Sequence, residues 1–599
     1  MNIYQESRLI AKREQARNYI EVTDFGDLLL AYLQQLDVEY VFGIPGGAIE
    51  PFYNALARSD RQGGPRTIVA RHEAGAAYMA DGYSRNSGKL GVVCSTTGPG
   101  ATNLITGVAA TAEYNIPLLV ITAQTPLSSF GASAVQESSC TAINTVALYQ
   151  QMCRYSTLIS HPDQFERKLV TAIMTAFSER GPAHISVPMD IWHLRPTSKQ
   201  PAFNLPDLLD RPSLFDTAAV DQLTREIQQA RNPVFLIGDE AAEAIGLILS
   251  VALKVNARVI ATPQGKGLVS PYHPLFRGVI GVAGHQSARE LIQDAAVDRI
   301  FVIGAHLGQW ATSGWDLQAF NNRIIHIEEN EVNLAKTPMA GLHVRGRIAT
   351  VFETVLGEIS DEALDYAAFG KRQNTEPTER ERAFKLDDEA GFISDARPLK
   401  PQRLMRELPN IFPAQTHYLA DVGNSFAWAI HYLHPYDRRI AGRRDAKGGL
   451  FRATLDFAPM GWAIGSAVGT ALAHPGEPVV CITGDGAMLM SGQEITVAIQ
   501  EQLPVIYVVL NDNAFGMVKH GQRMTGAEPI AFDLPKVDFA QFARAMGAQA
   551  FTIDCAEDLL LLDGAAICRR PGPTLLDVRI DPEAIPPIGG RTDFLRANS

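Results

Sequence analysis

Short apolar runs rich in β-branched residues alternate with helix-like patterns along almost the whole chain, and this alternation limits the fold more than any other feature. It is typical of βαβ units, in which parallel strands are joined by helices that cover both faces of a sheet. With 599 residues, the chain is too long for a single hydrophobic core. We therefore predict an α/β protein with three Rossmann-like domains, each built on a parallel sheet.

Two polar segments divide the pattern into three blocks, which we expect to be the domains. The predicted blocks are residues 22–195, 213–358 and 402–590, and the segments 196–212 and 360–401 between them have the composition of linkers. The first and third blocks share a layout of strand, Gly-rich turn, helix and a second strand preceded by Pro, which predicts a duplicated architecture. The expected strands are 39–43, 67–70, 91–95, 117–122, 184–188, 234–238, 257–262, 299–304, 323–328, 479–483 and 505–510.

Composition excludes several classes of protein. A net charge of −12 with no basic cluster to offset it argues against nucleic acid as a partner. The absence of any uninterrupted apolar run of about 18 residues argues against a membrane span. The six cysteines contain no CxxC pair, so we expect reduced thiols. With a polar N-terminus, these features predict a cytoplasmic protein that acts on small molecules.

The most informative motif is a buried strand that ends in Gly484-Asp485-Gly486. A helical pattern follows, which we expect to begin at a capping box formed by Ser491 and Glu494. The next buried strand ends in Asn511-Asp512-Asn513. Because a right-handed crossover makes the two strands parallel, Asp485 and Asp512 should meet at one carboxyl edge.

Two carboxylates beside glycine-flanked backbone have a definite chemistry. Mg²⁺ takes oxygen ligands and is usually held by one or two carboxylates together with phosphate oxygens. Glycines let backbone amides approach an anion, and the start of a helix offers unpaired N–H groups. We therefore predict a site for Mg²⁺ and a diphosphate.

A second candidate lies in the first block, at Arg71-His72-Glu73. These residues follow a predicted strand and precede a helical segment, so Glu73 should lie in a crevice at the end of that strand. The residue four positions after His72 is Ala76, so this is not a zinc-binding HExxH motif.

Together these segments resemble the thiamine-diphosphate enzymes, specifically the group of acetolactate synthase and pyruvate oxidase. The resemblance covers nearly the whole chain. It rests on Gly484-Asp485-Gly486 and on the stretch around His72-Glu73, and also on Phe42-Gly-Ile-Pro-Gly-Gly-Ala48, Thr97-Gly-Pro-Gly-Ala-Thr-Asn103, Gln124, Gln136-Glu137, Asp421-Val-Gly423 and Pro459-Met-Gly461.

The resemblance implies roles for individual residues. Glu73 would hydrogen-bond the pyrimidine ring of the cofactor and promote its imino form, and Gln136 would act beside it in catalysis. Asp485, Asp512 and the Ala514 carbonyl would hold the metal, although a shift of one residue would select Asn513 in place of Asp512. The remaining cofactor-binding residues would be Asn103, Gly423, Asn424, Ser425, Met460, Gly484, Gly486, Ala487 and Met517, of which Met460 could equally be a core residue.

Some positions depart from the biosynthetic synthases. The resemblance implies Phe, Lys and Trp in those enzymes at or near the positions of Val135, Arg154 and Gly521, so the acceptor pocket should differ. The basic stretch Arg438–Arg452 is either a solvated loop or a rim that attracts an anionic substrate. The segment from Gly304 to Gly308 lacks the Arg that helps hold FAD in relatives, so we do not expect FAD to be required.

The expected reaction is decarboxylation of a 2-oxo acid followed by ligation of the remaining fragment to a second carbonyl, as in the conversion of two pyruvates to 2-acetolactate and CO₂. An alternative is the same chemistry on another 2-hydroxy ketone, diketone or aldehyde. A non-catalytic regulator with this fold is a further alternative, which the presence of Glu73 and Asp485 disfavours. Because relatives combine the Glu and the metal site of different chains, the resemblance implies a homodimer or homotetramer.

Overall fold

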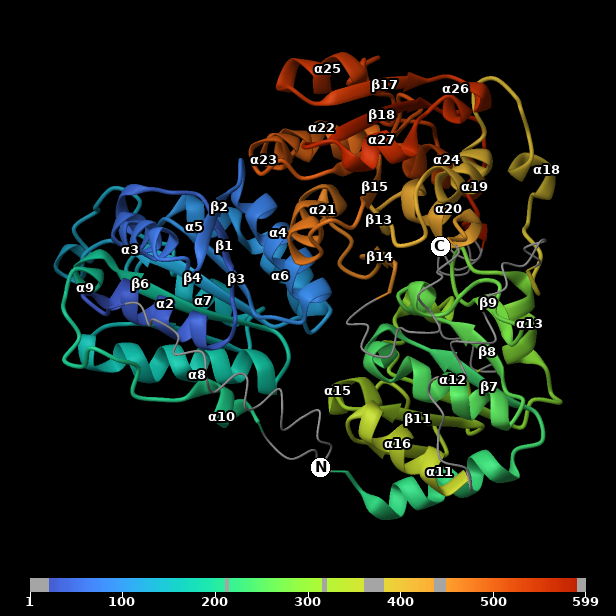
Figure 1. The fold of residues 1–599 in the computed structure, drawn as a ribbon, viewed down its shortest axis with the longest axis horizontal. Helices are drawn as coiled ribbons and strands as arrows, with labels where there is room; N and C mark the ends of the chain where they lie inside the picture. The colour runs from blue at the N-terminus through green and yellow to red at the C-terminus, as the bar shows by residue number, and fades with distance from the viewer. Residues whose placement is uncertain (1–20, 211–214, 315–319, 360–381, 436–448, 590–599) are drawn as a thin grey trace. The chain divides into compact units, whose positions relative to one another are not determined.

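The computed structural model describes residues 21–210, 215–314, 320–359, 382–435 and 449–589. These residues contain three six-stranded sheets in which every strand pairing is parallel (Figure 1). The chain forms two compact units. The first unit consists of residues 1–76 and 89–211, and the second of residues 77–88 and 212–599.

The first unit is one sheet with helices on both faces. Its strands lie in the order β2-β1-β3-β4-β6-β5. Side chains such as Phe52, Phe165 and Trp192 are buried under the helices, with the Phe52 and Trp192 rings stacked 5.2 Å apart. The elements are α2 (Phe25–Gln35), β1 (Tyr40–Gly43), α3 (Glu50–Arg61), β2 (Arg66–Val69), α4 (Glu73–Ser87), β3 (Gly91–Ser95), α5 (Pro99–Asn103), α6 (Ile105–Glu113), β4 (Leu118–Gln124), α7 (Thr145–Gln150), β5 (Tyr155–Leu158), α8 (Phe165–Ser178), β6 (Pro182–Pro188), α9 (Met189–Trp192) and α10 (Leu205–Leu209).

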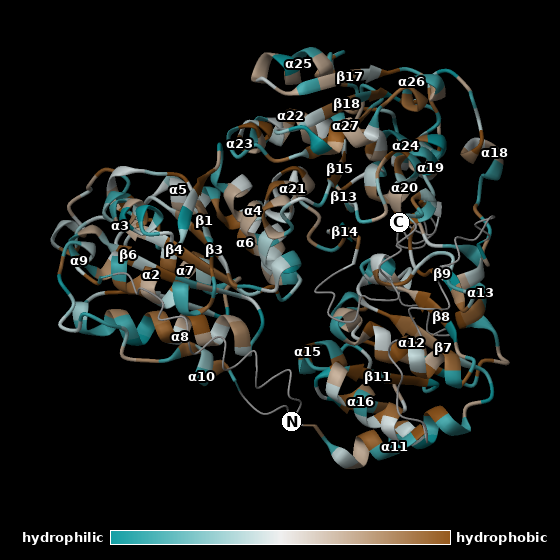
Figure 2. Cartoon of the chain, in the orientation of Figure 1, coloured by the Kyte–Doolittle hydropathy of each residue, from teal (hydrophilic) through white to brown (hydrophobic). Residues whose placement is uncertain are grey.

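The central sheet, in the second unit, has the order β12-β11-β10-β7-β8-β9, in which the two halves diverge from β7 and β10. Its strands carry the hydrophobic colour in Figure 2. The elements are α11 (Thr217–Gln229), β7 (Pro233–Ile237), α12 (Ile245–Lys254), β8 (Arg258–Ala261), β9 (Phe276–Val279), α13 (Gln286–Gln293), β10 (Arg299–Ile303), α14 (Gln309–Thr312), β11 (Ile324–Glu328), α15 (Glu331–Leu334), β12 (Leu342–Arg345) and α16 (Ile348–Ile359).

The third sheet has the order β14-β13-β15-β16-β18-β17, which repeats the order of the first sheet strand for strand. The duplicated architecture predicted for the first and third blocks is therefore confirmed. The elements are α18 (Glu389–Phe392), α19 (Pro401–Ile411), β13 (His417–Ala420), α20 (Asn424–Tyr432), β14 (Phe451–Ala453), α21 (Trp462–Ala473), β15 (Val479–Gly484), α22 (Asp485–Ser491), α23 (Ile495–Gln500), β16 (Val505–Asn511), α24 (Gly516–Thr525), α25 (Phe539–Met546), β17 (Gln549–Ile553), α26 (Ala556–Leu560), α27 (Gly564–Arg569) and β18 (Thr574–Arg579).

Every strand expected from the sequence is present, with ends shifted by no more than two residues. Seven strands within the described residues were not expected: the edge strands β5, β9, β12, β14 and β17 and the interior strands β13 and β18. The predicted capping box is wrong: α22 already begins at Asp485, and Ser491 makes no cap hydrogen bond with its side chain. The polypeptide therefore enters a helix directly from β15, without an intervening loop.

All six cysteines are free thiols, as expected. None of the helices within the described residues combines the length and hydropathy needed to cross a bilayer.

Candidate active site

Three neighbouring strands of the third sheet, β13, β15 and β16, deliver the candidate residues to one edge. Helices α20, α22 and α24 begin within a few residues of the carboxyl ends of these strands. The residues preceding these helices, Gly423, Gly484 and Phe515, provide no side-chain cap. Two N–H groups at these helix starts already have partners, since Gly486 donates to Asp485 Oδ1 and Gly516 to the Ala514 carbonyl. The strand order reverses between β13 and β15, the position at which open α/β sheets bind ligands.

Asp485 and Asp512 form a buried pair of carboxyl groups at this edge. The Asp485 Oδ1 atom accepts a hydrogen bond from the Gly486 N–H at 2.7 Å, whereas its Oδ2 atom is buried without a hydrogen-bond partner. Burial, followed by repulsion from Asp512, raises the pKa of Asp485 to about 7, and burial raises the pKa of Asp512 to about 6. An unpartnered carboxylate oxygen beside a second carboxyl is an environment that a bound cation stabilises.

Gly516 marks the point where Asp512 meets the start of α20. A β-carbon on Gly516 would lie 2.6 Å from Asn424 Nδ2 and 2.7 Å from Asp512 Oδ2, so only glycine leaves room for both side chains. The Asn424 Oδ1 atom is buried without a hydrogen-bond partner. The Ala514 carbonyl accepts the Gly516 N–H at 2.8 Å and keeps a second lone pair for a metal.

The glycines beside Asp485 lie against other candidate residues. A β-carbon on Gly486 would lie 2.6 Å from the Phe515 ring and 3.3 Å from the Met460 methyl group, and one on Gly484 would lie 3.7 Å from Ser425 Oγ. Met460 and Ser425 therefore border the same space as the Asp pair. Ala487 is buried in the first turn of α22. Met517 packs against the hydrophobic core of the second unit, and no contact joins it to Met460.

Asp421 connects three segments of this edge, a role that was not predicted from the sequence. Its buried carboxylate accepts hydrogen bonds from Val422 N at 3.0 Å, Gly461 N at 3.0 Å and Thr483 Oγ1 at 2.9 Å. It thereby ties the end of β13 to the loop carrying Met460 and to β15. Burial raises the pKa of Asp421 to about 6. The sequence feature that could have identified Asp421 is a lone Asp directly after a buried strand.

The pH dependence of metal binding follows from the Asp pair. Protons compete with the cation below pKa values of about 7 for Asp485 and about 6 for Asp512 in the metal-free protein. We expect the affinity for Mg²⁺ to fall steadily as the pH is lowered from about 8 to about 5, because the cation binds only the ionised carboxylates. Calorimetric titration with Mg²⁺ across this range measures the effect, and a constant Kd would contradict it.

In the first unit, Glu73 is the first residue of α4 and follows β2. Its half-buried carboxylate accepts a hydrogen bond from the Asn103 amide, with 3.0 Å between Asn103 Nδ2 and Glu73 Oε2. Asn103 is the last residue of α5, and a β-carbon on Gly100 in the same helix would lie 3.5 Å from Glu73 Oε1. The predicted strand-end position of Glu73 is therefore observed, and Asn103 holds its carboxylate.

Gln136 lies on a loop that is fastened to the other end of α5. Its backbone has a φ of +62°, and its carbonyl accepts a hydrogen bond from Thr97 Oγ1 at 3.0 Å. Gly98 is so close that a β-carbon there would lie 2.9 Å from the Gln136 carbonyl oxygen. Gln124 steadies the loop by donating to Ser138 Oγ at 3.1 Å. Gln136 is exposed.

The positions that depart from the biosynthetic synthases have different surroundings. Val135 is 88% exposed, and a β-carbon on Gly521 would meet no atom within 4 Å. The Arg154 guanidinium donates to Asn115 Oδ1 at 2.8 Å and packs on Gly181, so Arg154 is bound within its own unit. Most of the basic stretch, residues 438–448, lies outside the described residues.

Comparisons with known proteins agree with this arrangement. Three family models match the chain: the N-terminal binding domain of thiamine pyrophosphate enzymes over residues 23–145, their central domain over 220–355 and their C-terminal binding domain over 421–578. Acetolactate synthase isozyme 3 large subunit of Escherichia coli is 30% identical, with 90% of this chain and 91% of that protein covered. The chain belongs to the acetolactate synthase-like family of thiamine-diphosphate enzymes.

Other members of this family are similarly related. A protein of Mycobacterium tuberculosis assigned as the acetolactate synthase large subunit IlvB2 is 31% identical, with 93% of this chain and 98% of that protein covered. A crystal structure from Mycobacterium smegmatis, assigned as a thiamin diphosphate-dependent enzyme, has a TM-score of 0.72 at 20% identity and covers 93% of this chain and 99% of that one. This family member is therefore a thiamine-diphosphate-dependent enzyme of the lyase or transferase kind with three α/β domains.

Proposed function

We propose that the protein converts two molecules of a 2-oxo acid, with pyruvate as the first choice, to a 2-hydroxy-3-oxo acid and CO₂, using thiamine diphosphate and Mg²⁺. The observation that carries this proposal is the unpartnered Asp485 Oδ2 atom beside Asp512, at a sheet edge where three helices begin. The similarity to acetolactate synthase large subunits supports the choice of pyruvate.

The residues at the third sheet divide between the metal and the diphosphate. We assign Mg²⁺ to Asp485, Asp512 and the Ala514 carbonyl, and the diphosphate to backbone N–H groups around Gly423, Gly484, Gly486 and Ala487 with the side chains of Asn424 and Ser425. Met460 and Met517 would support the rings. When bound, the cofactor supplies a ring carbon that adds to the substrate carbonyl and accepts the electron pair left by CO₂.

Glu73 is assigned the proton chemistry. A carboxyl group that shares a proton with a ring nitrogen must be held at a fixed angle, and the Asn103 hydrogen bond at 3.0 Å supplies this restraint. Gln136 is assigned to the acceptor side of the site because its loop is fastened to α5, the helix that carries Asn103.

A second candidate function is carboligation with a different acceptor, such as an aldehyde, a diketone or a 2-hydroxy ketone. The exposed Val135 and the open space at Gly521 favour it, because small side chains replace large ones at positions that differ from the biosynthetic synthases. A smaller side chain at a position that contacts the acceptor leaves room for a larger second substrate.

We propose a homodimer or homotetramer in which Glu73 of one chain serves the metal site of another. On α22, the helix that begins with Asp485, Leu489 is 45% exposed and Met490 is 52% exposed. Apolar side chains beside a polar site are typical of a surface that a second subunit covers.

We also propose that FAD is not required. The ends of β7 and β10 pack closely, since a β-carbon on Gly238 would lie 2.0 Å from the Gly304 carbonyl oxygen, and this leaves little room for a dinucleotide diphosphate.

The reaction is tested with purified protein, thiamine diphosphate, Mg²⁺ and pyruvate. We expect CO₂ release and formation of 2-acetolactate, detected as acetoin after acidification, and no product when Mg²⁺ is removed by a chelator. Mass spectrometry with a panel of 2-oxo acids and aldehydes tests the second candidate. Failure to bind thiamine diphosphate in calorimetry with excess Mg²⁺ would overturn both.

A further inference from the structure

A second hollow in the protein lies at the opposite end of α20 from the proposed diphosphate site. Helix α20 begins at Asn424 and ends at Tyr432, and a cavity of about 270 Å³ is lined by Tyr432, His434 and residues of α18 and α19. Its cationic lining residues are Arg382 and Arg406, and none of the described residues that line it is acidic. The composition of this cavity is that of a site for a small anion.

The two guanidinium groups retain hydrogen-bonding capacity. Arg382 Nη2 lies 3.3 Å from Glu389, whereas its Nη1 atom is buried without a hydrogen-bond partner. Arg406 forms only a 3.7 Å ion pair with Glu407. The His434 Nε2 atom is also buried without a partner, in a residue that is 5% exposed. An unsatisfied buried donor such as Arg382 Nη1 is stabilised by an anionic acceptor, and the neutral His434 ring can add a hydrogen bond in the tautomer protonated at Nε2.

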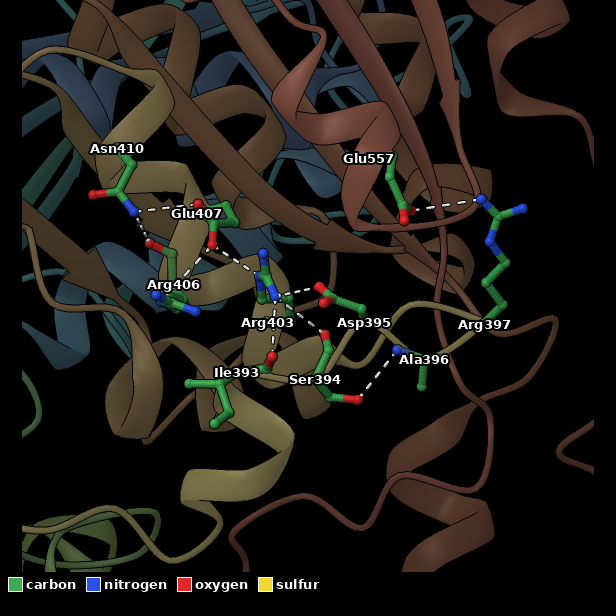
Figure 3. Close-up of polar contacts among 10 residues, drawn as sticks. All are labelled: Ile393, Ser394, Asp395, Ala396, Arg397, Arg403, Arg406, Glu407, Asn410 and Glu557. Atoms are coloured by element: carbon green, nitrogen blue, oxygen red, sulfur yellow. Dashed lines mark hydrogen bonds and ion pairs between the residues drawn. The ribbon is translucent and has the colours of Figure 1, made fainter.

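The neighbouring Arg403, one turn earlier in α19, shows the contrast (Figure 3). Its guanidinium donates to Glu407 at 2.8 Å, to Asp395 at 2.6 Å and to the Ile393 carbonyl at 3.1 Å, so its donors serve the fold. Asn410 also donates a hydrogen bond to Glu407, with 3.2 Å between Asn410 Nδ2 and Glu407 Oε2. Glu407 is thus committed to Arg403 and Asn410, which leaves Arg406 weakly neutralised.

Aromatic rings line the same cavity. The Phe392 ring lies 4.9 Å from the Arg382 guanidinium carbon and 5.9 Å from that of Arg406, and its centroid is 6.2 Å from the Tyr432 ring at an interplanar angle of 28°. Flat surfaces beside guanidinium groups favour a ligand with a planar ring and a negative group. At about 270 Å³ the cavity is slightly smaller than the usual range for ligand sites, about 300–1,000 Å³, which suits a small ligand and excludes a dinucleotide.

The negative end of α20 does not oppose an anion here, because it is capped. The buried Lys266 donates from Nζ to the carbonyls of Ile430 at 2.8 Å and Leu433 at 2.7 Å. A cation at the C-terminal end of a helix offsets the partial negative charge of the unpaired carbonyls.

We propose that this cavity binds a nucleoside monophosphate, with the phosphate between Arg382 and Arg406 and the base among Phe392, Tyr272 and Tyr432. Helix α20 joins this site to Asn424 of the diphosphate cradle, so an occupant would contact the far end of an element used by the cofactor. The proposal does not depend on which 2-oxo acid the protein uses.

Calorimetry tests the site with AMP as the probe and the holoenzyme saturated with thiamine diphosphate and Mg²⁺, so that the cradle is filled. We expect one AMP per chain and at least about ten-fold weaker binding for Arg382→Gln and for Arg406→Gln, since each loses charge-assisted hydrogen bonds to phosphate. The AMP affinity of Arg406→Lys should lie between those of the unmodified protein and Arg406→Gln, because Lys keeps the charge but not the bidentate geometry. Arg397→Gln is the matched control. Arg397 lies between α18 and α19, its side chain is 68% exposed, and it pairs with Glu557 at 3.5 Å.

The comparison of probes decides the ligand class. Inorganic phosphate and adenosine should each bind at least about ten-fold more weakly than AMP. The proposal is overturned if AMP does not bind, if either fragment binds as tightly as AMP, or if Arg397→Gln weakens binding as much as the other two arginine variants. Melting curves confirm that the variants are folded. Because binding is measured without turnover, a protein inactive on pyruvate does not affect the result.

Discussion

Replacing Glu73 with Gln should lower the rate of pyruvate decarboxylation at least about 100-fold, the lower end of what a positioned acid–base group contributes. Gln keeps the shape and can still contact the Asn103 amide, which lies 3.0 Å from the carboxylate. It cannot share a proton with a ring nitrogen. The rate of CO₂ release from pyruvate measures the effect, and calorimetry should find thiamine diphosphate affinity changed by less than about ten-fold, since binding energy resides mainly in the metal and diphosphate.

The matched control for Glu73 is Glu50→Gln. Glu50 is also an acid in the first turn of a helix of the same unit, α3, and is exposed. Its replacement should leave turnover unchanged, because its contribution is limited to the helix dipole. Asn103→Ala should lower turnover less than Glu73→Gln, since it removes only the restraint on the carboxylate. Full activity of the Glu73→Gln protein would contradict the assignment of the proton chemistry.

Replacing Asp485 with Asn should weaken Mg²⁺ binding at least about 100-fold. Removing a residue that only orients a metal ligand lowers metal affinity by up to about 100-fold, and loss of a direct ligand should lower it at least as much. The carboxylate has one buried oxygen without a partner, and an amide presents a single, uncharged oxygen in its place. Without the metal, the diphosphate should lose its main anchor. Titrations with Mg²⁺ and with thiamine diphosphate give both affinities.

Two further variants assign the second acid. Asp512→Ala should weaken Mg²⁺ binding strongly and Asn513→Ala only slightly, because Asp512 faces Asp485 and raises its pKa. Asp533→Asn, which changes an exposed acid of a nearby loop, is the control and should have no effect. If Asn513→Ala were the more damaging variant, the metal ligand would be shifted by one residue. The melting temperature of the metal-free protein separates misfolding from lost binding.

The fold was predictable where a strand is a continuous apolar run, whereas the interior strand His417–Ala420 was missed although all four of its residues are buried. Runs such as Val479–Gly484 and Val505–Asn511 consist almost entirely of apolar residues, and such runs are recognisable without a partner strand. Edge strands such as Tyr155–Leu158, whose residues are only half-buried, lack this signal. The α22 start was misplaced for a related reason, since Ser491 and Glu494 match a cap motif that the backbone does not use.

The candidate residues were predictable because chemistry and position coincide at strand ends. Glu73 and Asp485 each follow a strand and precede a helix, and parallel topology places such residues at a carboxyl edge. The approach of Asn424 to Asp512 around Gly516 could not be predicted, because it joins segments about 90 residues apart along the chain. The same holds for the hydrogen bonds of Asp421 with Gly461 and Thr483, which are 40 and 62 residues away in the chain.

The sequence by itself determined the class of fold, the family resemblance and the identity of the acids, because periodicity and motif spacing are local properties of the chain. Tertiary structure alone decided which oxygen atoms lack partners, that Asp512 raises the pKa of Asp485, and where two arginines face one cavity. These properties depend on burial and on distances between residues remote in sequence, and burial removes the water that would otherwise satisfy and screen those groups.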